Sequence, residues 1–189
     1  MGLRRLLLAL ACAAIAATFS GCFLEEEHEE GEPLREGLAV SVGGIEYTVY
    51  ITRELNPSLP DDRGYWKGEE AEPGFALYGV FLQACNRSGE NEDDEVETDT
   101  HEATEDFVVV DTQGNEYEPL EAEEDNVFHY HPQELEPGAC IPEEGSLAQL
   151  GPTAGAMLPF LFPLEAGENR PLELEIHADG EEAAVELDL

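Results

Sequence analysis

The feature that most constrains the fold of this chain is a repeated alternation of apolar and polar residues, interrupted by two-residue turn signals. Residues 38–42 (LAVSV) and 45–52 (IEYTVYIT) alternate on either side of Gly43-Gly44, and PLELEIHA alternates again before Asp179-Gly180. A period of two places the apolar side chains on one face of a strand, and Gly-Gly or Asp-Gly favours a tight hairpin. The sequence therefore predicts antiparallel β-hairpins.

Two other stretches predict strands with particular places in a sheet. Residues 75–86 (FALYGVFLQACN) are apolar at both alternating sets of positions, which is typical of a central strand covered on both faces. AMLPFLFPL contains Pro159 and Pro163, which cannot donate a backbone hydrogen bond and therefore favour a sheet edge or a bulge. No stretch shows a convincing helical apolar stripe. We expect an all-β chain with about seven or eight short strands in an antiparallel β-sandwich.

The order of these segments resembles a known family. The apolar strand that ends in Asn86 is followed by a D-x-x-G-x-x-Y turn at residues 111–117, then by an L-x-P-G turn at residues 135–138. Residues 38–189 are thus similar to the telokin-like, immunoglobulin-fold domain of unknown function found in bacterial lipoproteins and secreted proteins. The resemblance implies an immunoglobulin-like β-sandwich with an extracytoplasmic role, and it transfers no catalytic residue. The long loops at 53–74 and 87–105 depart from the family's pattern.

The N-terminal residues have the pattern of an export signal. An arginine pair precedes an uncharged, mostly apolar stretch from Leu6 to Phe19, which is shorter than the roughly 20 residues of a membrane-spanning helix. The sequence F-S-G-C, ending at Cys22, is similar to the site cut by lipoprotein signal peptidases, although leucine is commoner than phenylalanine at its first position. We predict a lipoprotein signal peptide at residues 1–21 and a lipid on Cys22. An ordinary secretory signal is the alternative, and the arginine pair does not separate general from twin-arginine export.

The segment after the lipid site predicts a tether. Residues 22–37 are acidic and poor in apolar side chains, which is typical of disorder, and residues 38–189 are long enough for one domain. No later stretch predicts a membrane span, because the best one, Ala154 to Leu164, is short and holds two prolines. The expected location is the extracytoplasmic side of the cell membrane, where the lipid is the membrane partner.

The charge of the chain restricts its other partners. The sequence has 44 Asp and Glu against 8 Lys and Arg, for a formal net charge of −36. Nucleic acid is excluded because phosphate contacts need clustered Lys and Arg, and anionic lipid is disfavoured for the same reason. A protein partner or cations such as calcium remain as candidates. Because self-repulsion weakens a compact state at low ionic strength, we expect stability to rise with added salt.

Two of the four cysteines are candidates for a disulfide. Cys12 leaves with the signal peptide and Cys22 takes the lipid, so Cys85 and Cys140 remain in an oxidising compartment. Closing the loop between them would stabilise the fold by about 4 kcal/mol in the chain-entropy model. The alternative is two buried free thiols.

Two regions carry potential metal ligands. The acidic loop at residues 90–106 offers many of the oxygens that calcium needs, but its spacing is not that of an EF-hand, and a solvated loop is the alternative. His129 and His131 share one face of an extended segment, and a transition metal would need further ligands such as His101. The alternative is a pair of exposed histidines beside a turn at Pro132. We assign no metal site.

The remaining candidates point to binding rather than catalysis. Tyr65-Trp66 could contact a partner, or Trp66 could cap an open end of the sandwich. Asn86 begins a glycosylation sequon, and Ser146 lacks the glycines of a nucleophile elbow. We expect no enzyme activity and no cofactor. The predicted function is a lipid-anchored binding or structural module, with calcium binding by the 90–106 loop as the alternative.

Overall fold

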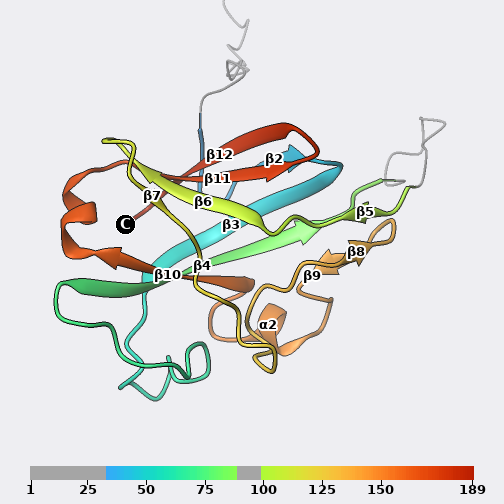
Figure 1. Ribbon diagram of the computed structural model, residues 1–189. Helices are drawn as coiled ribbons and strands as arrows, with labels where there is room; N and C mark the ends of the chain where they lie inside the picture. Colours follow the sequence, from blue (N-terminus) through green and yellow to red (C-terminus); the bar gives the residue numbers. More distant parts are fainter. Residues whose placement is uncertain (1–32, 89–98) are drawn as a thin grey trace, which may run out of the picture. The chain divides into compact units, whose positions relative to one another are not determined.

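The computed structural model describes residues 33–88 and 99–189, and the regular elements of these residues are mainly strands (Figure 1). Among them, seven strands have four or more residues, in agreement with the expected seven or eight. The strands form two facing sheets, so the domain is a β-sandwich. The predicted signal peptide, the lipid site Cys22 and the first part of the predicted tether lie outside the described residues.

The first sheet combines the C-terminal hairpin of the domain with strands from its middle. Its order is β1-β12-β11-β6-β7, and every neighbouring pair is antiparallel except β1 with β12. Leu172, Leu174 and Ile176 of β11 are all buried, as their alternation predicted. The strands are β1 (Leu34–Arg35), β12 (Glu181–Leu187), β11 (Leu172–Ala178), β6 (Asp106–Asp111) and β7 (Glu116–Tyr117).

The second sheet has the order β10-β4-β3-β2, and β9 also pairs with β4. The proline-containing strand β10 is at its edge, as predicted, and β4 lies between β10 and β3. The strands are β10 (Ala156–Pro163), β4 (Phe75–Cys85), β3 (Ile45–Glu54), β2 (Ala39–Val42) and β9 (Cys140–Ile141). The other elements are a small ribbon of β5 (His101–Glu102) with β8 (Glu134–Leu135), the helix α2 (Leu147–Leu150) and the 3-10 helix η1 (Leu164–Glu168).

The predicted hairpin turns are present. Val42 pairs with Ile45 across Gly43-Gly44, and both glycines have positive φ, which is the left-handed conformation that a two-residue hairpin of this kind requires. A side chain at position 44 would not fit, because a Cβ on Gly44 would lie 2.4 Å from the ring of His101. The turn at Asp179-Gly180 has positive φ at both residues and joins β11 to β12.

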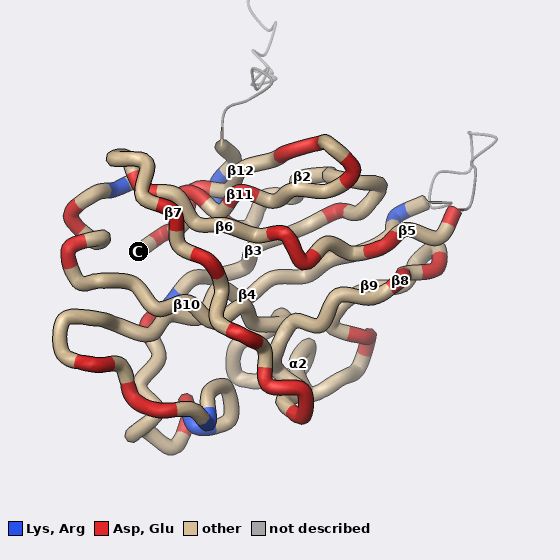
Figure 2. The backbone as a smooth tube through the Cα atoms, viewed as in Figure 1, with Lys and Arg blue, Asp and Glu red and all other residues tan. Residues whose placement is uncertain are grey.

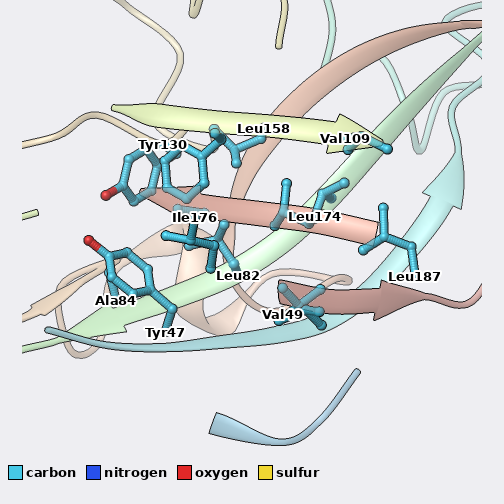
Figure 3. Close-up of a cluster of buried hydrophobic side chains, with 14 of the residues drawn as sticks. Tyr47, Val49, Leu82, Ala84, Val109, Tyr130, Leu158, Leu174, Ile176 and Leu187 are labelled. Atoms are coloured by element: carbon cyan, nitrogen blue, oxygen red, sulfur yellow. The ribbon is translucent and has the colours of Figure 1, made fainter. Parts of the chain in front are cut away.

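The main core lies between the two sheets. Tyr47 and Val49 from the second sheet face Leu174 and Ile176 from the first, and Figure 3 shows these side chains meeting in the space between the strands. All four are inaccessible to solvent. Burial of an aliphatic side chain of this size contributes roughly 1.5–3 kcal/mol, so the alternating pattern of each strand determines which face turns inward.

Thr52 on β3 is a polar residue in this apolar setting, and we expect Thr52→Val to stabilise the domain. Its side chain is 4% exposed, it pairs with the core residue Val80, and its hydroxyl has no hydrogen-bond partner among the described residues. A buried unsatisfied hydroxyl costs about 1 kcal/mol or more, and valine has the same shape without it. Urea unfolding should show a gain of about 1 kcal/mol, while the half-buried control Thr48→Val should change little. A loss of stability in Thr52→Val would contradict this account.

The structure corrects the predicted start of the domain. Residues 34–37 were assigned to a disordered tether, but β1 pairs with the edge of β12, Gly37 N–H donates to the Val49 carbonyl, and the Glu36 side chain accepts from the Asp188 N–H. Leu34 packs against the main core. The backbone pairing on an open sheet edge outweighs the acidic composition of this segment. Among the described residues, no helix is long and apolar enough to cross a membrane.

Candidate functional site

The outer face of the second sheet carries a second apolar cluster. Leu77 and Phe81 of β4 and Met157 of β10 point away from the main core and are at most 3% exposed. They are covered by residues 55–74, which we call the flap, and by residues 118–130, which we call the crossing segment. Leu55 and Tyr65 of the flap complete the cluster. The prediction that residues 75–86 form a central strand covered on both faces is therefore confirmed.

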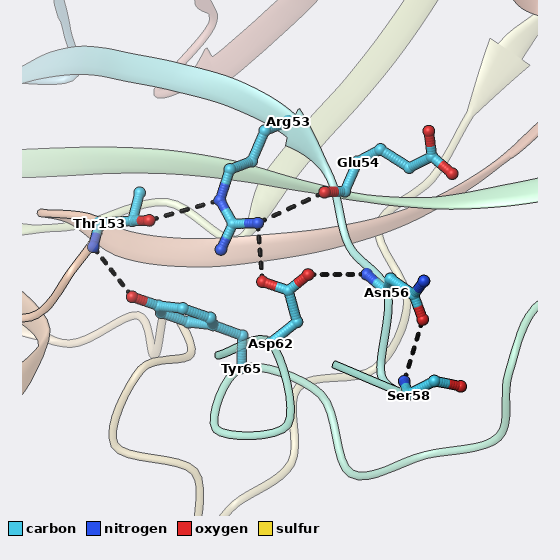
Figure 4. Close-up of polar contacts among 7 residues, drawn as sticks. All are labelled: Arg53, Glu54, Asn56, Ser58, Asp62, Tyr65 and Thr153. Carbon is cyan, nitrogen blue, oxygen red and sulfur yellow. Dashed lines mark hydrogen bonds and ion pairs between the residues drawn. The ribbon is translucent and has the colours of Figure 1, made fainter. Parts of the chain in front are cut away.

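The flap is anchored to the sheet by an ion pair beneath it. Arg53 Nη1 lies 2.8 Å from Asp62 Oδ1, and Arg53 Nε donates to Thr153 Oγ1 (Figure 4). The Arg53 guanidinium also sits 5.3 Å from the ring centroids of Tyr65 and Phe81. Asp62 is 6% exposed and accepts a second bond from a flap backbone N–H. These contacts hold the flap in place and occupy Nε and Nη1 of Arg53.

Of the aromatic pair of the flap, the structure buries Tyr65 and leaves Trp66 partly exposed. The Tyr65 side chain is 2% exposed, and its hydroxyl accepts a hydrogen bond from the Thr153 N–H. Trp66 stacks on the ring of His129 at 6.2 Å between centroids and donates from Nε1 to the Glu69 carbonyl. Trp66 therefore covers the outer face of a sheet and does not cap an open end of the sandwich.

His129 is buried, which overturns both interpretations of the histidine pair. Its ring is 3% exposed. Nδ1 accepts from the Glu123 N–H at 2.8 Å, so the proton resides on Nε2, which donates to the Tyr65 carbonyl at 2.7 Å. Both nitrogens are occupied by protein backbone, and His129 is neither a metal ligand nor an exposed ring. His131 is half-buried, with Nε2 3.3 Å from the Asn126 carbonyl oxygen.

The turn after β6 is organised by one carboxylate. Asp111, which opens the D-x-x-G-x-x-Y sequence, is 5% exposed and accepts from the backbone N–H groups of Gln113 and Asn115. Its Oδ2 also accepts from the side chains of Asn115, Tyr117 and Asn169. Burial alone would raise the pKa of Asp111, but these hydrogen bonds outweigh burial and hold the pKa well below its usual range.

The L-x-P-G turn is organised by Asn86 and the disulfide beside it. Asn86 is fully buried and donates from Nδ2 to the carbonyls of Asp99 and Leu135, and the Gly138 N–H donates to its backbone carbonyl. A glycan on that nitrogen would break these bonds, so the sequon is structural. Cys85 and Cys140 pair across β4 and β9 with their sulfurs 2.05 Å apart, in agreement with the predicted disulfide.

A groove of about 780 Å³ opens beside this disulfide. Its lining includes Gln83, Arg87 and four glutamates, one in β8 and three between β8 and α2. Arg87 Nε lies 3.1 Å from Glu46 Oε1. The excess of carboxylates would attract cationic groups. Among the described lining residues there is no nucleophile next to a base. The glutamates are Glu134, Glu136, Glu143 and Glu144.

Other candidates from the sequence have structural roles or lie outside the described residues. The Ser146 hydroxyl accepts from the Gln149 N–H and caps α2. The acidic 90–106 loop is described only from residue 99 onward, so its predicted calcium site is not addressed. Within the described ranges, no group of three or more His, Cys, Asp or Glu side chains is placed to hold a metal ion.

Acidic side chains are spread over the described surface, and Lys and Arg are few (Figure 2). On the outer face of the first sheet, Glu173 of β11 lies directly opposite Glu186 of β12. Partial burial and the charges of Glu175 and Glu186 raise the pKa of Glu173. Like charges in such cross-strand pairs repel, which gives a local reason for the expected gain in stability with salt.

Comparisons with known proteins relate the chain to two solved structures. No protein-family profile matches the sequence, and no curated protein sequence matches it. The chain is similar to the yjhA protein from Bacillus subtilis, with a TM-score of 0.48 and 12% identity over 82% of this chain and 99% of that one. It is also similar to an uncharacterized beta-sandwich protein from Clostridium difficile 630, with a TM-score of 0.44 and 14% identity over 86% of this chain and 99% of that one.

Proposed function

We propose that this protein is an extracytoplasmic lipoprotein whose immunoglobulin-like β-sandwich acts as a non-catalytic binding or structural module at the membrane surface. A lipid on Cys22 holds the domain, and a protein partner contacts its exposed surface. The disulfide between Cys85 and Cys140 is the structural observation that carries the proposal, because disulfides form and persist in oxidising compartments. The F-S-G-C sequence after an apolar stretch is the matching feature of the sequence.

The length of the proposed tether follows from the residue at which the sandwich begins. The sandwich begins at Leu34, so residues 23–33 separate it from the lipid site. A fully extended segment of that length reaches at most roughly 40 Å. The acidic charge of the domain disfavours contact with anionic lipid, so the lipid provides the hold on the membrane.

We expect Cys22→Ala to release the domain from the membrane in folded, soluble form. The measurement is membrane fractionation of cells that make the tagged protein, with the mass of the processed N-terminus determined in parallel. The matched control is Cys12→Ala, which alters a cysteine of the signal peptide and should stay membrane-bound and acylated. Retention of Cys22→Ala on the membrane would contradict the lipid anchor, and a wild-type protein released without acylation would point to an ordinary secretory signal.

A further inference from the structure

His129 joins the two segments that cover the outer face of the second sheet. Its Nε2–H donates to the Tyr65 carbonyl of the flap, and its Nδ1 accepts from the Glu123 N–H of the crossing segment. Asn126 reinforces the junction by donating from Nδ2 to the Tyr65 carbonyl and to Glu123 Oε2. The backbone on either side of His129 is bonded to Met157 of β10, which holds the ring at the sheet edge.

This arrangement accommodates only a neutral imidazole. A protonated ring carries N–H groups on both nitrogens, so Nδ1–H would face the Glu123 N–H, and two donors would oppose each other. The ring must then leave its position or lose one of its two bonds. Because the ring is 3% exposed, water cannot solvate the new charge without an opening of the cover.

The groups around the ring shift the pKa of His129 in opposite directions. Burial lowers the pKa of His129 below its ordinary value, and the positive charges of His131 and Lys67 act in the same direction. The Tyr65 carbonyl and the Glu123 carboxylate oppose them. The closed state therefore has its full stability above the ordinary histidine pKa of about 6.5 and loses it as the pH falls below that value.

The main core lacks a comparable group. Among the described residues, His129 is the buried histidine, whereas His101, His131 and His177 are partly exposed. The buried carboxylate of the first sheet, Asp111, stays ionised to much lower pH because of its hydrogen bonds. The sandwich and its cover should therefore respond to acid in different pH ranges.

We propose that His129 is a pH-sensitive switch. Its protonation releases the flap and uncovers the apolar outer face of the second sheet, while the sandwich stays folded. The surface that becomes accessible contains Leu77, Phe81 and Met157. Opening is linked to one proton, so its equilibrium constant should rise by about tenfold per pH unit below 6.5, until the pH reaches the pKa of the closed state.

Trp66 provides a specific probe, because it is the single tryptophan of the chain and stacks on His129. The full chain is titrated from pH 7.5 to 4.5 in 0.5 M salt, which screens the general negative charge. We expect the Trp66 emission to change with a midpoint below 6.5 while far-UV circular dichroism stays constant. Hydrogen exchange, corrected for the intrinsic rate at each pH, should lose protection in the flap but not in β11 and β12.

Two variants make the test specific. His129→Gln should abolish the change in Trp66 emission between pH 7.5 and 4.5, whether the substitution leaves the flap closed or loosens it. His131→Gln should keep the transition and move its midpoint upward, because it removes a charge that disfavours protonated His129. An unchanged transition in His129→Gln would overturn the proposal. So would loss of protection in the flap and the sandwich at the same pH in the wild-type chain, a result that does not depend on whether a variant folds.

Discussion

Replacing Cys85 and Cys140 together with alanine is expected to lower the free energy of unfolding by about 4 kcal/mol. The two residues are separated by 55 positions, so the disulfide removes much of the conformational freedom of that loop from the unfolded chain. The bond also ties β4 to β9 next to Asn86, where the L-x-P-G turn is held. Its loss should increase the mobility of the turn and of the acidic groove beside it.

Guanidinium unfolding at pH 7 and constant salt measures this effect. Wild-type protein reduced with dithiothreitol is the matched control, because it keeps both side chains and loses only the bond. Cys85 is 1% exposed, so the alanine variant also loses some packing, and the reduced wild-type protein separates this contribution from that of the covalent link. If the reduced and oxidised wild-type proteins unfold at the same denaturant concentration, the disulfide does not stabilise the fold.

The second large effect is expected at Asp111, where Asp111→Asn should destabilise the domain strongly at pH 7 and much less in acid. The carboxylate accepts bonds from donors on both sides, and an asparagine would direct its own amide hydrogens at Asn115 or Asn169. The folded-state pKa of Asp111 lies below its value of about 3.9 in an unfolded chain. Its contribution to stability is therefore complete above about pH 4 and is lost progressively as the pH falls toward the folded-state pKa.

Thermal unfolding of the wild-type and variant proteins between pH 2 and 8 tests whether the contribution of Asp111 to stability is lost in acid. The difference between their melting temperatures should be constant from pH 8 down to about 5 and should shrink below 4. Asp106→Asn is the matched control, because Asp106 lies at the exposed start of the same strand and has no comparable set of donors among the described residues. A difference that stays constant down to pH 2 would show that shape, rather than charge, determines the role of Asp111.

The strands were the predictable part of this molecule. Each depends on a period-two pattern and a local turn, and both are properties of neighbouring residues, as at Gly43-Gly44 and Asp179-Gly180. The apolar residues on both faces of β4 also predicted that its outer face would be covered. The part of the cover formed by the crossing segment could not be predicted, because that segment lies far from β4 in the sequence and has no periodic pattern.

In the candidate site, too, the sequence indicated which residues matter but not what they contact. Sequence patterns singled out His129, Tyr65, Trp66 and Asn86, but as possible ligands, contact residues or a glycan acceptor. The structure buries three of them and commits their polar atoms to the backbone of distant segments. The signal that could have identified these roles is weak, because a histidine or asparagine in a loop has the same appearance in a sequence whether its partners are solvent or protein.

The sequence by itself determined the strand pattern, the tight turns and the large negative charge. These follow from local backbone preferences and from composition, which do not depend on distant contacts. Only the tertiary structure decided that the domain begins at β1, that Asp111 and Asn86 organise their turns, and that His129 joins the flap to the crossing segment. Each of these depends on hydrogen bonds between residues that fold alone brings together, and a hydrogen-bond partner far along the chain leaves no periodic trace in the sequence.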